Sequence, residues 1–276
     1  MTMLSINTNV GALTAAQHSH SVNKSMETSM ERLASGKRIN QAADDAAGLA
    51  ISTRINAEIQ GLQQSIKNAG DAQSLLNTAE GALDEVHTIL LRMRELAVQS
   101  SNDTVRDQDR DMLQTEVAQL EAEIQRISDD TTWSGMTLLA GGFTTGATFQ
   151  IGPRDTDTIQ ISISAIDATL AAGLGLNSHV SLQANAQDYI VIIDNAISVI
   201  SADRAKYGAT INRLDHAMAN MANIVTNLSA SAGRIADADY AAESANLART
   251  QVLQQASMAM LSQANASKQN ILSLFQ

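Results

Sequence analysis

The sequence predicts a mostly α protein, an elongated helical bundle or coiled coil that carries a small β hairpin. Apolar residues recur at alternating spacings of three and four over long stretches, which is typical of helices packed as a coiled coil. The chain of 276 residues contains a single proline, Pro153, so little interrupts helices elsewhere. Aromatic residues make up only 3% of the chain, which favours long helices joined by many small contacts over one round core.

The longest series of apolar residues lies toward the C-terminus and predicts one helix of about 40 residues, roughly 60 Å long at 1.5 Å per residue. It begins at Ile190 and is interrupted only by Arg204, whose aliphatic stem can cover the seam while the guanidinium reaches water. The residues expected to line the coiled-coil seam are Ile197, Ile211, Leu214, Met218, Met221, Val225 and Leu228.

Two further series of the same kind predict two more helices. The first consists of Ile55, Ile59, Leu62, Ile66, Ala69, Leu76 and Leu83. The second consists of Leu113, Val117, Leu120, Ile124 and Ile127. Thr104 is the expected N-cap of this second helix. Because each helix has an apolar seam that needs a partner, the three are expected to form one bundle.

A β hairpin is predicted near residues 147–165, between the second and third of these helical regions. Ile159, Ile161 and Ile163 alternate with polar residues, which is the period of a strand with one buried face. Phe149 and Ile151 form a shorter partner strand, and the intervening residues 152–157, Gly-Pro-Arg-Asp-Thr-Asp, have the composition of a turn.

The two ends of the chain resemble each other in being almost free of charge. Residues 1–23 contain no Asp, Glu, Lys or Arg, and residues 241–276 contain only Glu243, Arg249 and Lys268. A lone helix so poor in large apolar groups buries too little surface to offset its ordering entropy. Each end is therefore expected to become ordered only against partners. Apolar positions of the C-terminal segment still recur helically, at Leu253, Ala256, Met260, Ala264, Ile271 and Leu274.

Composition excludes several classes of function. The formal net charge of −11 and the pI of about 4.8 argue against binding to nucleic acid, which needs a clustered basic face. The absence of cysteine removes disulfides, thiolate nucleophiles and Cys-based metal sites. The N-terminus has neither the basic nor the apolar region of a secretory signal peptide, and no apolar run is long enough for insertion into a membrane.

Two residue pairs have the composition of chemical sites, and each has a simpler interpretation. His18 and His20 resemble a metal-binding pair, but residues two apart on a helix point to different faces, so ordinary polar positions are favoured. Asp44 and Asp45 resemble an acid–base pair, but they precede an Ala-rich helical run. Aspartates at such a position accept hydrogen bonds from free N–H groups of the first turn.

No motif for catalysis or cofactor binding is present. The sequence lacks H-E-x-x-H, G-x-S-x-G and P-loop patterns, and Asp155 and Asp157 lack the Glu-terminated loop of a calcium site. Methionines such as Met218 and Met221 fall at seam spacing, so core packing explains them. The sequence therefore predicts no enzyme, no cofactor and no metal site.

Several motifs, in order along the whole chain, resemble those of bacterial flagellins. They are SINTN at 5–9, RLASGKRIN at 32–40, ADDAAGLAI at 43–51, RELAVQS at 94–100, WSGMTLL at 133–139, QASMAMLSQAN at 255–265 and LSLFQ at 272–276. The resemblance implies an inner coiled-coil domain formed by both termini, residues 1–44 and 235–276. It also implies an outer-core helical domain at 45–234 that includes the hairpin. Only residues 165–188 stand where many members carry additional outer domains, so this chain resembles a short form.

The resemblance also implies a function, which is to polymerise into the flagellar filament for swimming motility. It implies export of the unfolded chain through the flagellar type III apparatus, so that the protein is secreted and extracellular. The implied partners are further copies of the chain, the hook-associated junction and cap proteins, and a flagellar export chaperone. A junction protein that forms a short collar is an alternative, but the motifs at 32–51 and 94–100 favour the filament subunit. Some members carry an inserted metalloprotease domain. Such a domain would need the motif H-E-x-x-H, which this sequence lacks.

A binding role is a further alternative. By composition, residues 91–100 form a solvated, salt-bridged helix face. By resemblance, Arg92, Leu96 and Glu116 would form a patch recognised by Toll-like receptor 5 of animal hosts, with Leu96 expected to be exposed. Arg92 and Leu96 are four residues apart and would share a helix face.

Overall fold

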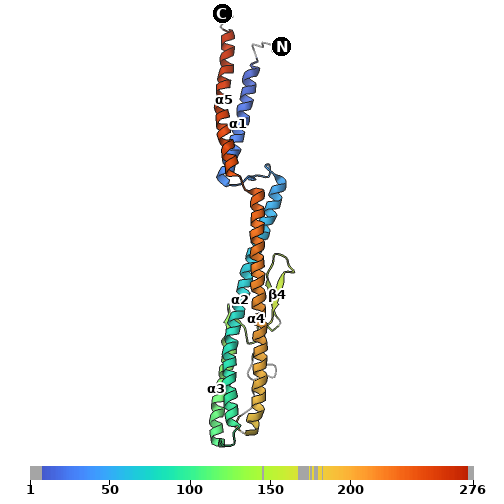
Figure 1. The fold of residues 1–276 in the computed structure, drawn as a ribbon, viewed down its shortest axis with the longest axis vertical. Helices are drawn as coiled ribbons and strands as arrows, with labels where there is room; N and C mark the ends of the chain where they lie inside the picture. The colour runs from blue at the N-terminus through green and yellow to red at the C-terminus, as the bar shows by residue number, and fades with distance from the viewer. Residues whose placement is uncertain are drawn as a thin grey trace. The chain divides into compact units, whose positions relative to one another are not determined.

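The computed structural model describes residues 8–144, 146–166, 174, 176, 180–181 and 183–272. Its helices are α1 (Val10–Ser35), α2 (Ala46–Ser100), α3 (Asp107–Asp130), α4 (Gln183–Ala236) and α5 (Tyr240–Leu272) (Figure 1). Its strands are β1 (Thr132–Trp133), β2 (Met136–Thr137), β3 (Ala147–Gln150) and β4 (Thr158–Ile161). The predicted fold class, mostly α with a small hairpin, is confirmed. Residues 5–7 of the first motif, residues 273–276 of the last and much of segment 165–188 lie outside the described residues.

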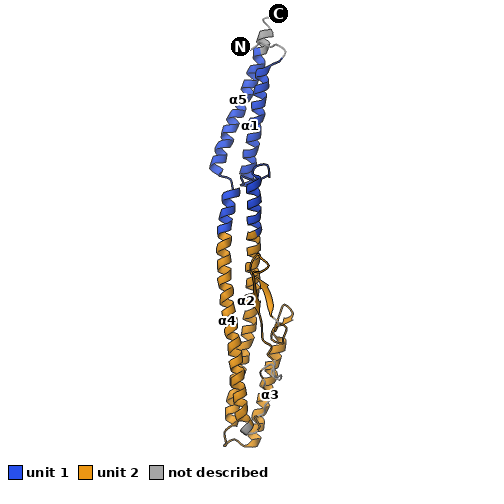
Figure 2. Ribbon diagram, turned by 90° about the vertical axis from the view of Figure 1, so that its right-hand side faces the viewer, with its two compact units in different colours: residues 1–57, 227–276 blue, residues 58–226 orange. Residues whose placement is uncertain are grey.

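The chain divides into two compact units, shown in different colours in Figure 2. Unit 1 consists of residues 1–57 and 227–276, and unit 2 of residues 58–226. Unit 1 therefore joins the two ends of the chain, which are far apart in sequence. The proposed inner and outer-core domains, divided near residues 44 and 235, remain a prediction.

In unit 2, the buried side chains of α2 include a regular series whose members are alternately three and four residues apart. The buried residues at this spacing are Leu62, Ser65, Ala69, Ala72, Leu76, Ala79, Leu83, Val86, Leu90, Met93, Ala97 and Ser100. This regularity is the heptad pattern of a coiled coil. The predicted seam is buried at Leu62, Ala69, Leu76 and Leu83, and its remaining members, Ile55, Ile59 and Ile66, are half-buried.

Helix α4 has 54 residues, and its buried stripe differs in part from the predicted seam. Leu214 and Met221 are buried, whereas Ile197, Ile211, Met218, Val225 and Leu228 are half-buried. In the first half of the helix, Ile193, Ile200 and Tyr207 of the apolar series are buried, and so are Tyr189, Ala196 and Asp203, each one residue before Ile190, Ile197 and Arg204. At Tyr189 a third helix contributes to the burial, because the Tyr189 hydroxyl donates a hydrogen bond to Glu121 of α3 at 2.6 Å.

Helices α2 and α4 of unit 2 lie side by side and run antiparallel (Figures 1 and 2). Polar contacts between them pair rising residue numbers on α2 with falling numbers on α4. They are Gln73 with Asp215 at 3.0 Å, Glu80 with Arg204 at 2.7 Å and Arg94 with Asp194 at 2.6 Å. The Arg204 guanidinium, expected to reach water, thus pairs with carboxylates of α2.

Helix α3 buries Val117 and Ile124 and half-buries Leu113, Leu120 and Ile127, in accordance with its predicted apolar series. The predicted N-cap, Thr104, is wrong, because α3 begins at Asp107 and Arg106 occupies the cap position without a capping side-chain hydrogen bond. Asp107 and Asp109 lie in the first turn, where negative charge is favoured by the helix dipole.

A buried arginine closes the connection between α2 and α3. The Arg110 guanidinium donates to the backbone oxygens of Ser100, Asn102 and Val105, with distances of 3.1 Å to Asn102 and 3.0 Å to Val105. Carbonyl groups at a helix C-terminus have no partner within the helix. Arg110 therefore satisfies the end of α2 and the loop after it, a role that sequence periodicity did not reveal.

The predicted hairpin near residues 147–165 is confirmed. Strands β3 and β4 pair antiparallel, with Phe149 opposite Ile159, and Ile159 and Ile161 are buried. The hairpin is attached to α2, because the Asn68 amide donates to the backbone oxygen of Gln150 at 3.0 Å.

A second, shorter hairpin joins β1 to β2 and was not predicted. Its turn residues, Ser134 and Gly135, have φ values of 49° and 81°. Two consecutive positive φ angles are typical of the tight turns that match strand twist. The Ser-Gly dipeptide is the sequence feature from which this turn could have been predicted.

In unit 1, α1 and α5 pack against each other along their lengths and run antiparallel (Figure 1). The Asn9 amide donates to the Ala264 backbone oxygen at 3.1 Å, and the Gln254 amide donates to Asn23 Oδ1 at 2.9 Å. At the other end, the Tyr240 hydroxyl donates to the backbone oxygen of Leu33 at 3.2 Å.

Candidate assembly surface and recognition patch

The contact between α1 and α5 is made largely by small and polar side chains. The half-buried residues of α5 recur at the spacing of a seam and are Glu243, Asn246, Leu247, Thr250, Gln254, Ser257, Leu261 and Ala264. On α1, the buried residues are Ser19 and Ser29. This pairing therefore buries little large apolar surface, in contrast to the leucine-rich core of unit 2.

Several large apolar side chains of unit 1 are instead exposed. On α5 they are Val252, Leu253, Met258 and Met260, and on α1 they are Val10, Leu13 and Met30. The predicted apolar stripe of α5 is present, but Leu253, Ala256 and Met260 are exposed rather than packed against α1, and only Ala264 is half-buried. Of the remaining two members, the Ile271 side chain and Leu274 lie outside the described residues. Among the described residues, no other segment of the chain covers this most apolar face of α5.

A groove runs beside this stripe, between α1 and α5. Its volume is about 510 Å³. It is lined by residues of both helices that include Gly11, Thr14, Ala15 and His18 from α1 and Leu253, Ala256 and Met260 from α5. An apolar groove of helical length is suited to receive a further helix.

The motif at 32–40 forms the connection between the helices of unit 1. Gly36 ends α1 with a φ of 72°, a conformation that favours glycine. The Arg38 N–H donates to the Ala236 oxygen at 2.7 Å, and the Ala238 N–H donates to the Gly36 oxygen at 3.0 Å. These bonds bring the ends of α1 and α4 together by a short β-bridge, Lys37 with Asp237.

The adjacent motif at 43–51 starts α2; Asp45 has the capping role favoured by the sequence, whereas Asp44 instead binds backbone N–H groups of the loop before the helix. Asp45 Oδ1 accepts from the Gly48 N–H at 2.8 Å, and Asp44 Oδ2 accepts from the N–H groups of Asn40 and Gln41 at 3.1 and 3.0 Å. The hydrogen bonds from Gln41 and Asn40 lower the pKa of the Asp44 carboxyl. A Cβ at Gly48 would lie 2.5 Å from Asp45 Oδ2 and 2.7 Å from Ile39 Cδ1, so the cap leaves no room for a side chain.

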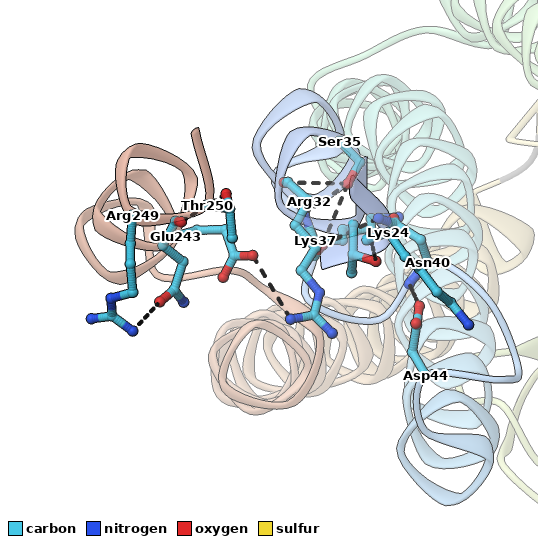
Figure 3. Close-up of polar contacts among 11 residues, drawn as sticks. Lys24, Arg32, Ser35, Lys37, Asn40, Asp44, Glu243, Arg249 and Thr250 are labelled. Atoms are coloured by element: carbon cyan, nitrogen blue, oxygen red, sulfur yellow. Dashed lines mark hydrogen bonds and ion pairs between the residues drawn. The ribbon is translucent and has the colours of Figure 1, made fainter. Parts of the chain in front are cut away.

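Charged residues of unit 1 are few, and one pair links its two terminal helices. Figure 3 shows Arg32 of α1 reaching toward Glu243 of α5, with 3.9 Å between Nη1 and Oε1. The same view shows the loop contact of Asn40 with Asp44. An ion pair at this distance contributes little energy by itself. It matches the only acidic residue of the described part of α5 to a basic residue of α1.

In unit 2, Arg92 and Glu116 lie together at the surface between α2 and α3. Arg92 donates to Glu116 Oε1 from Nε at 3.0 Å and from Nη2 at 2.9 Å, and to Glu95 Oε2 from Nη1 at 3.1 Å. The hydrogen bonds that the Arg92 guanidinium donates to these carboxylates, first that to Glu116, raise its pKa. Both side chains of the predicted patch that carry charge are therefore exposed and paired with each other.

The expectation of an exposed Leu96 is wrong, because its side chain is only 1% exposed. Leu96 lies next to the buried positions Met93 and Ala97, so the buried arc of α2 includes it. The exposed apolar side chains near Arg92 on α2 are instead Leu91 and Val98.

The other candidate residues do not assemble a chemical site. Within the described residues, no group of three or more His, Asp or Glu side chains is placed to hold a metal ion. Asp157 closes the hairpin turn, where its Oδ2 accepts from the Arg154 N–H at 3.3 Å. None of the described helices is long and apolar enough to cross a membrane.

The fold and these surfaces define a class of protein, a long-helix coiled-coil protein whose two chain ends pair with each other. Sequence comparison gives the family. Residues 6–144 match the family model "Bacterial flagellin N-terminal helical region", and residues 190–275 match "Bacterial flagellin C-terminal helical region". The chain belongs to the bacterial flagellin family.

Relatives and solved structures agree with this assignment. The chain is 42% identical to a flagellin of Halalkalibacterium halodurans, over 98% of this chain and 99% of the relative. It is 38% identical to a flagellin of Bacillus subtilis, with the same coverage of both chains. The crystal structure of Bacillus cereus flagellin is 36% identical and matches with a TM-score of 0.50, over 56% of this chain and 88% of that one. A putative flagellar hook-associated protein from Vibrio parahaemolyticus shares the fold at 17% identity, with a TM-score of 0.61 over 70% of this chain and 100% of that one.

Membership of the family defines the general role. The chain is a structural subunit of the bacterial flagellar filament, which is an extracellular polymer, and it is not an enzyme.

Proposed function

We propose that copies of this chain polymerise through unit 1, with the exposed apolar stripe of α5 packed against terminal helices of neighbouring copies. One observation carries the proposal. Helix α5 presents mostly small and polar residues to α1, with Leu247 and Leu261 among them, and leaves Leu253 and Met260 exposed, with Leu253 at 45%. Helices normally turn their most apolar face toward their partner. A face left open in this way is expected to be covered by another copy.

Energy and charge both support packing among copies. Full burial of a leucine or methionine side chain contributes about 1.5–3 kcal/mol, so a few such residues on each copy add up along a polymer. Charges that were buried without partners would cost more than this gain. The described part of α1 up to Asn23 has no charged residue. Among the described side chains of α5, the charged ones are Glu243 and Arg249. Dense packing of these helices therefore buries few charges.

Replacing Leu253 with aspartate tests the proposal. Leu253→Asp places a carboxylate on the exposed stripe and should raise the critical concentration for polymerisation at least about tenfold, equivalent to ~1.4 kcal/mol. The critical concentration is measured by sedimenting polymer away from monomer over a series of protein concentrations. Gln251→Asp adds the same charge at an exposed position of α5 outside the groove and serves as the control. Equal critical concentrations for the two variants would contradict the proposal, provided circular dichroism shows equal helix content.

We also propose that the subunit is exported unfolded through the flagellar type III apparatus, with a dedicated export chaperone. The proposed partners outside the cell are the hook-associated junction and cap proteins. The support is the composition of the terminal segments, which have few charges and form few strong contacts within the chain. Such segments need little energy to unfold and are suited to passage through a narrow channel.

A second proposed property is recognition of the monomer by Toll-like receptor 5. Its support from the structure is limited to the exposed pair Arg92 and Glu116, because Leu96 is buried. The apolar part of such a surface would come from Leu91 and Val98. A guanidinium beside exposed apolar groups has the composition of a small interface hot spot.

The double variant Arg92→Ala with Glu116→Ala tests this recognition. We expect receptor signalling by the monomer to fall by at least about tenfold, since hot-spot residues each contribute on the order of 2 kcal/mol. Stability should change by less than ~1 kcal/mol, because the pair is exposed. The matched control is Glu123→Ala with Arg126→Ala, which removes another exposed ion pair of 2.6 Å from α3. Reporter cells titrated with each monomer give the result, and equal signalling by both double variants would end the hypothesis.

A further inference from the structure

The methionine at position 260 combines two properties that no other methionine of the described residues shares. Its side chain is 64% exposed, and it lines the groove between α1 and α5. Met258, two residues earlier on the same helix, is 58% exposed but does not line the groove. Met112 in unit 2 is 73% exposed and lies on α3. The chain therefore has methionines of similar exposure inside and outside the surface proposed for polymerisation.

We propose that Met260 is a redox-modification site, at which oxidation of Sδ to the sulfoxide prevents the monomer from polymerising. The inference rests on the proposed assembly through the α5 stripe. The oxidant is a hydroperoxide, such as hydrogen peroxide. The sulfur lone pair attacks the outer oxygen, the O–O bond breaks and an S–O bond forms. The sulfur loses two electrons, the peroxide is reduced, and the departing hydroxide takes a proton to leave as water.

Exposure governs the first step. Thioether sulfur reacts with peroxide where solvent reaches it, and the cysteine-free chain offers no thiol that would react first. Met260 is open to solvent in the monomer. In the polymer its groove would be covered by a neighbouring copy, so the oxidation should act on subunits before they assemble and spare those already incorporated.

Polarity governs the second step. The sulfoxide converts a flexible apolar side chain into a polar one with a strong hydrogen-bond acceptor. The groove around it is lined by Gly11, Ala15, Leu253, Ala256 and Ala264, whose side chains supply no donor, and by the polar residues Thr14, His18, Ser257, Gln263 and Ser267. Closing the groove with an incoming helix would remove water from the sulfoxide oxygen without replacing all of its hydrogen bonds, which is unfavourable.

Position should decide which oxidation matters. Peroxide will also oxidise Met258 and Met112, since both are about as exposed as Met260. Their sulfoxides would lie outside the groove, so the loss of polymerisation should follow the state of residue 260 alone. This distinguishes a specific site from general oxidative damage.

The experiment uses the full-length monomer treated with hydrogen peroxide, with the sulfoxide content of each methionine measured by mass spectrometry. We expect oxidised wild type to show at least about a tenfold higher critical concentration for polymerisation, equivalent to ~1.4 kcal/mol. Met260→Leu, which keeps an apolar side chain of similar volume, should polymerise equally with and without peroxide. Met258→Leu should remain as sensitive as wild type. Treatment with methionine sulfoxide reductases should restore the wild type.

Two outcomes would overturn the inference. One is loss of polymerisation in peroxide-treated Met260→Leu to the extent seen in wild type. The other is normal polymerisation of wild type in which Met260 is fully oxidised. Met260→Gln places a polar side chain there without oxidation and should impair polymerisation, while circular dichroism reports whether the variant is folded. Failure of the proposed assembly surface is distinguishable, because Leu253→Asp would then polymerise normally without any oxidant.

Discussion

Removal of residues 241–276 is expected to abolish polymerisation and leave a soluble monomer whose unit 2 remains folded. The deletion removes nearly all of α5, including the exposed stripe and its half of the groove. It also leaves α1 without its partner, and a single helix of 26 residues with few large apolar groups is only marginally stable. Unit 2 should persist, because its buried core comes from α2, α3, α4 and the hairpins within residues 58–226.

Electron microscopy and thermal unfolding test the deletion together. Filaments formed by the truncated chain, under conditions in which the intact chain polymerises, would contradict the proposed role of α5. A truncated chain without a cooperative unfolding transition would contradict the independence of unit 2. The intact chain in the same buffer is the control for both measurements.

Replacement of Leu214 with aspartate is expected to destabilise the monomer by at least about 3 kcal/mol. Leu214 is fully buried on α4, at the same heptad position as Tyr207 and Met221. The variant loses the buried leucine and places a carboxylate in the bundle, where no basic partner is provided. Such a group either remains charged at high cost or takes up a proton, and each case lowers the free energy of unfolding.

Urea unfolding of unit 2 measures the effect of Leu214→Asp. The matched control is Asn212→Asp, two residues earlier on the same helix at an exposed position, which should change stability by less than ~0.5 kcal/mol. A loss below about 1 kcal/mol for Leu214→Asp would mean that α4 does not pack through this stripe.

Much of the fold was determined by local sequence. The alternating spacing of apolar residues predicted the three long helices of unit 2, and the single proline predicted that they would be uninterrupted. Alternation at Ile159 and Ile161, with the turn-forming residues before them, predicted the main hairpin. The capping role of Asp45 followed from its place before an Ala-rich helix. These features depend on neighbours a few residues away, and such neighbours are visible in the sequence.

Only the tertiary structure decided which neighbour covers which helix face. Periodicity grouped Leu253, Ala256 and Met260 on one face of α5, but it did not show that α1 packs against the adjacent, more polar face. It placed Leu96 beside Arg92, but it did not show that Leu96 is buried while Arg92 pairs with Glu116 of α3. It did not identify Tyr189 as a buried position of α4, which depends on a third helix. The spacing of residues determines which side chains share a face, whereas burial depends on how many segments surround the helix, and those segments are distant in sequence.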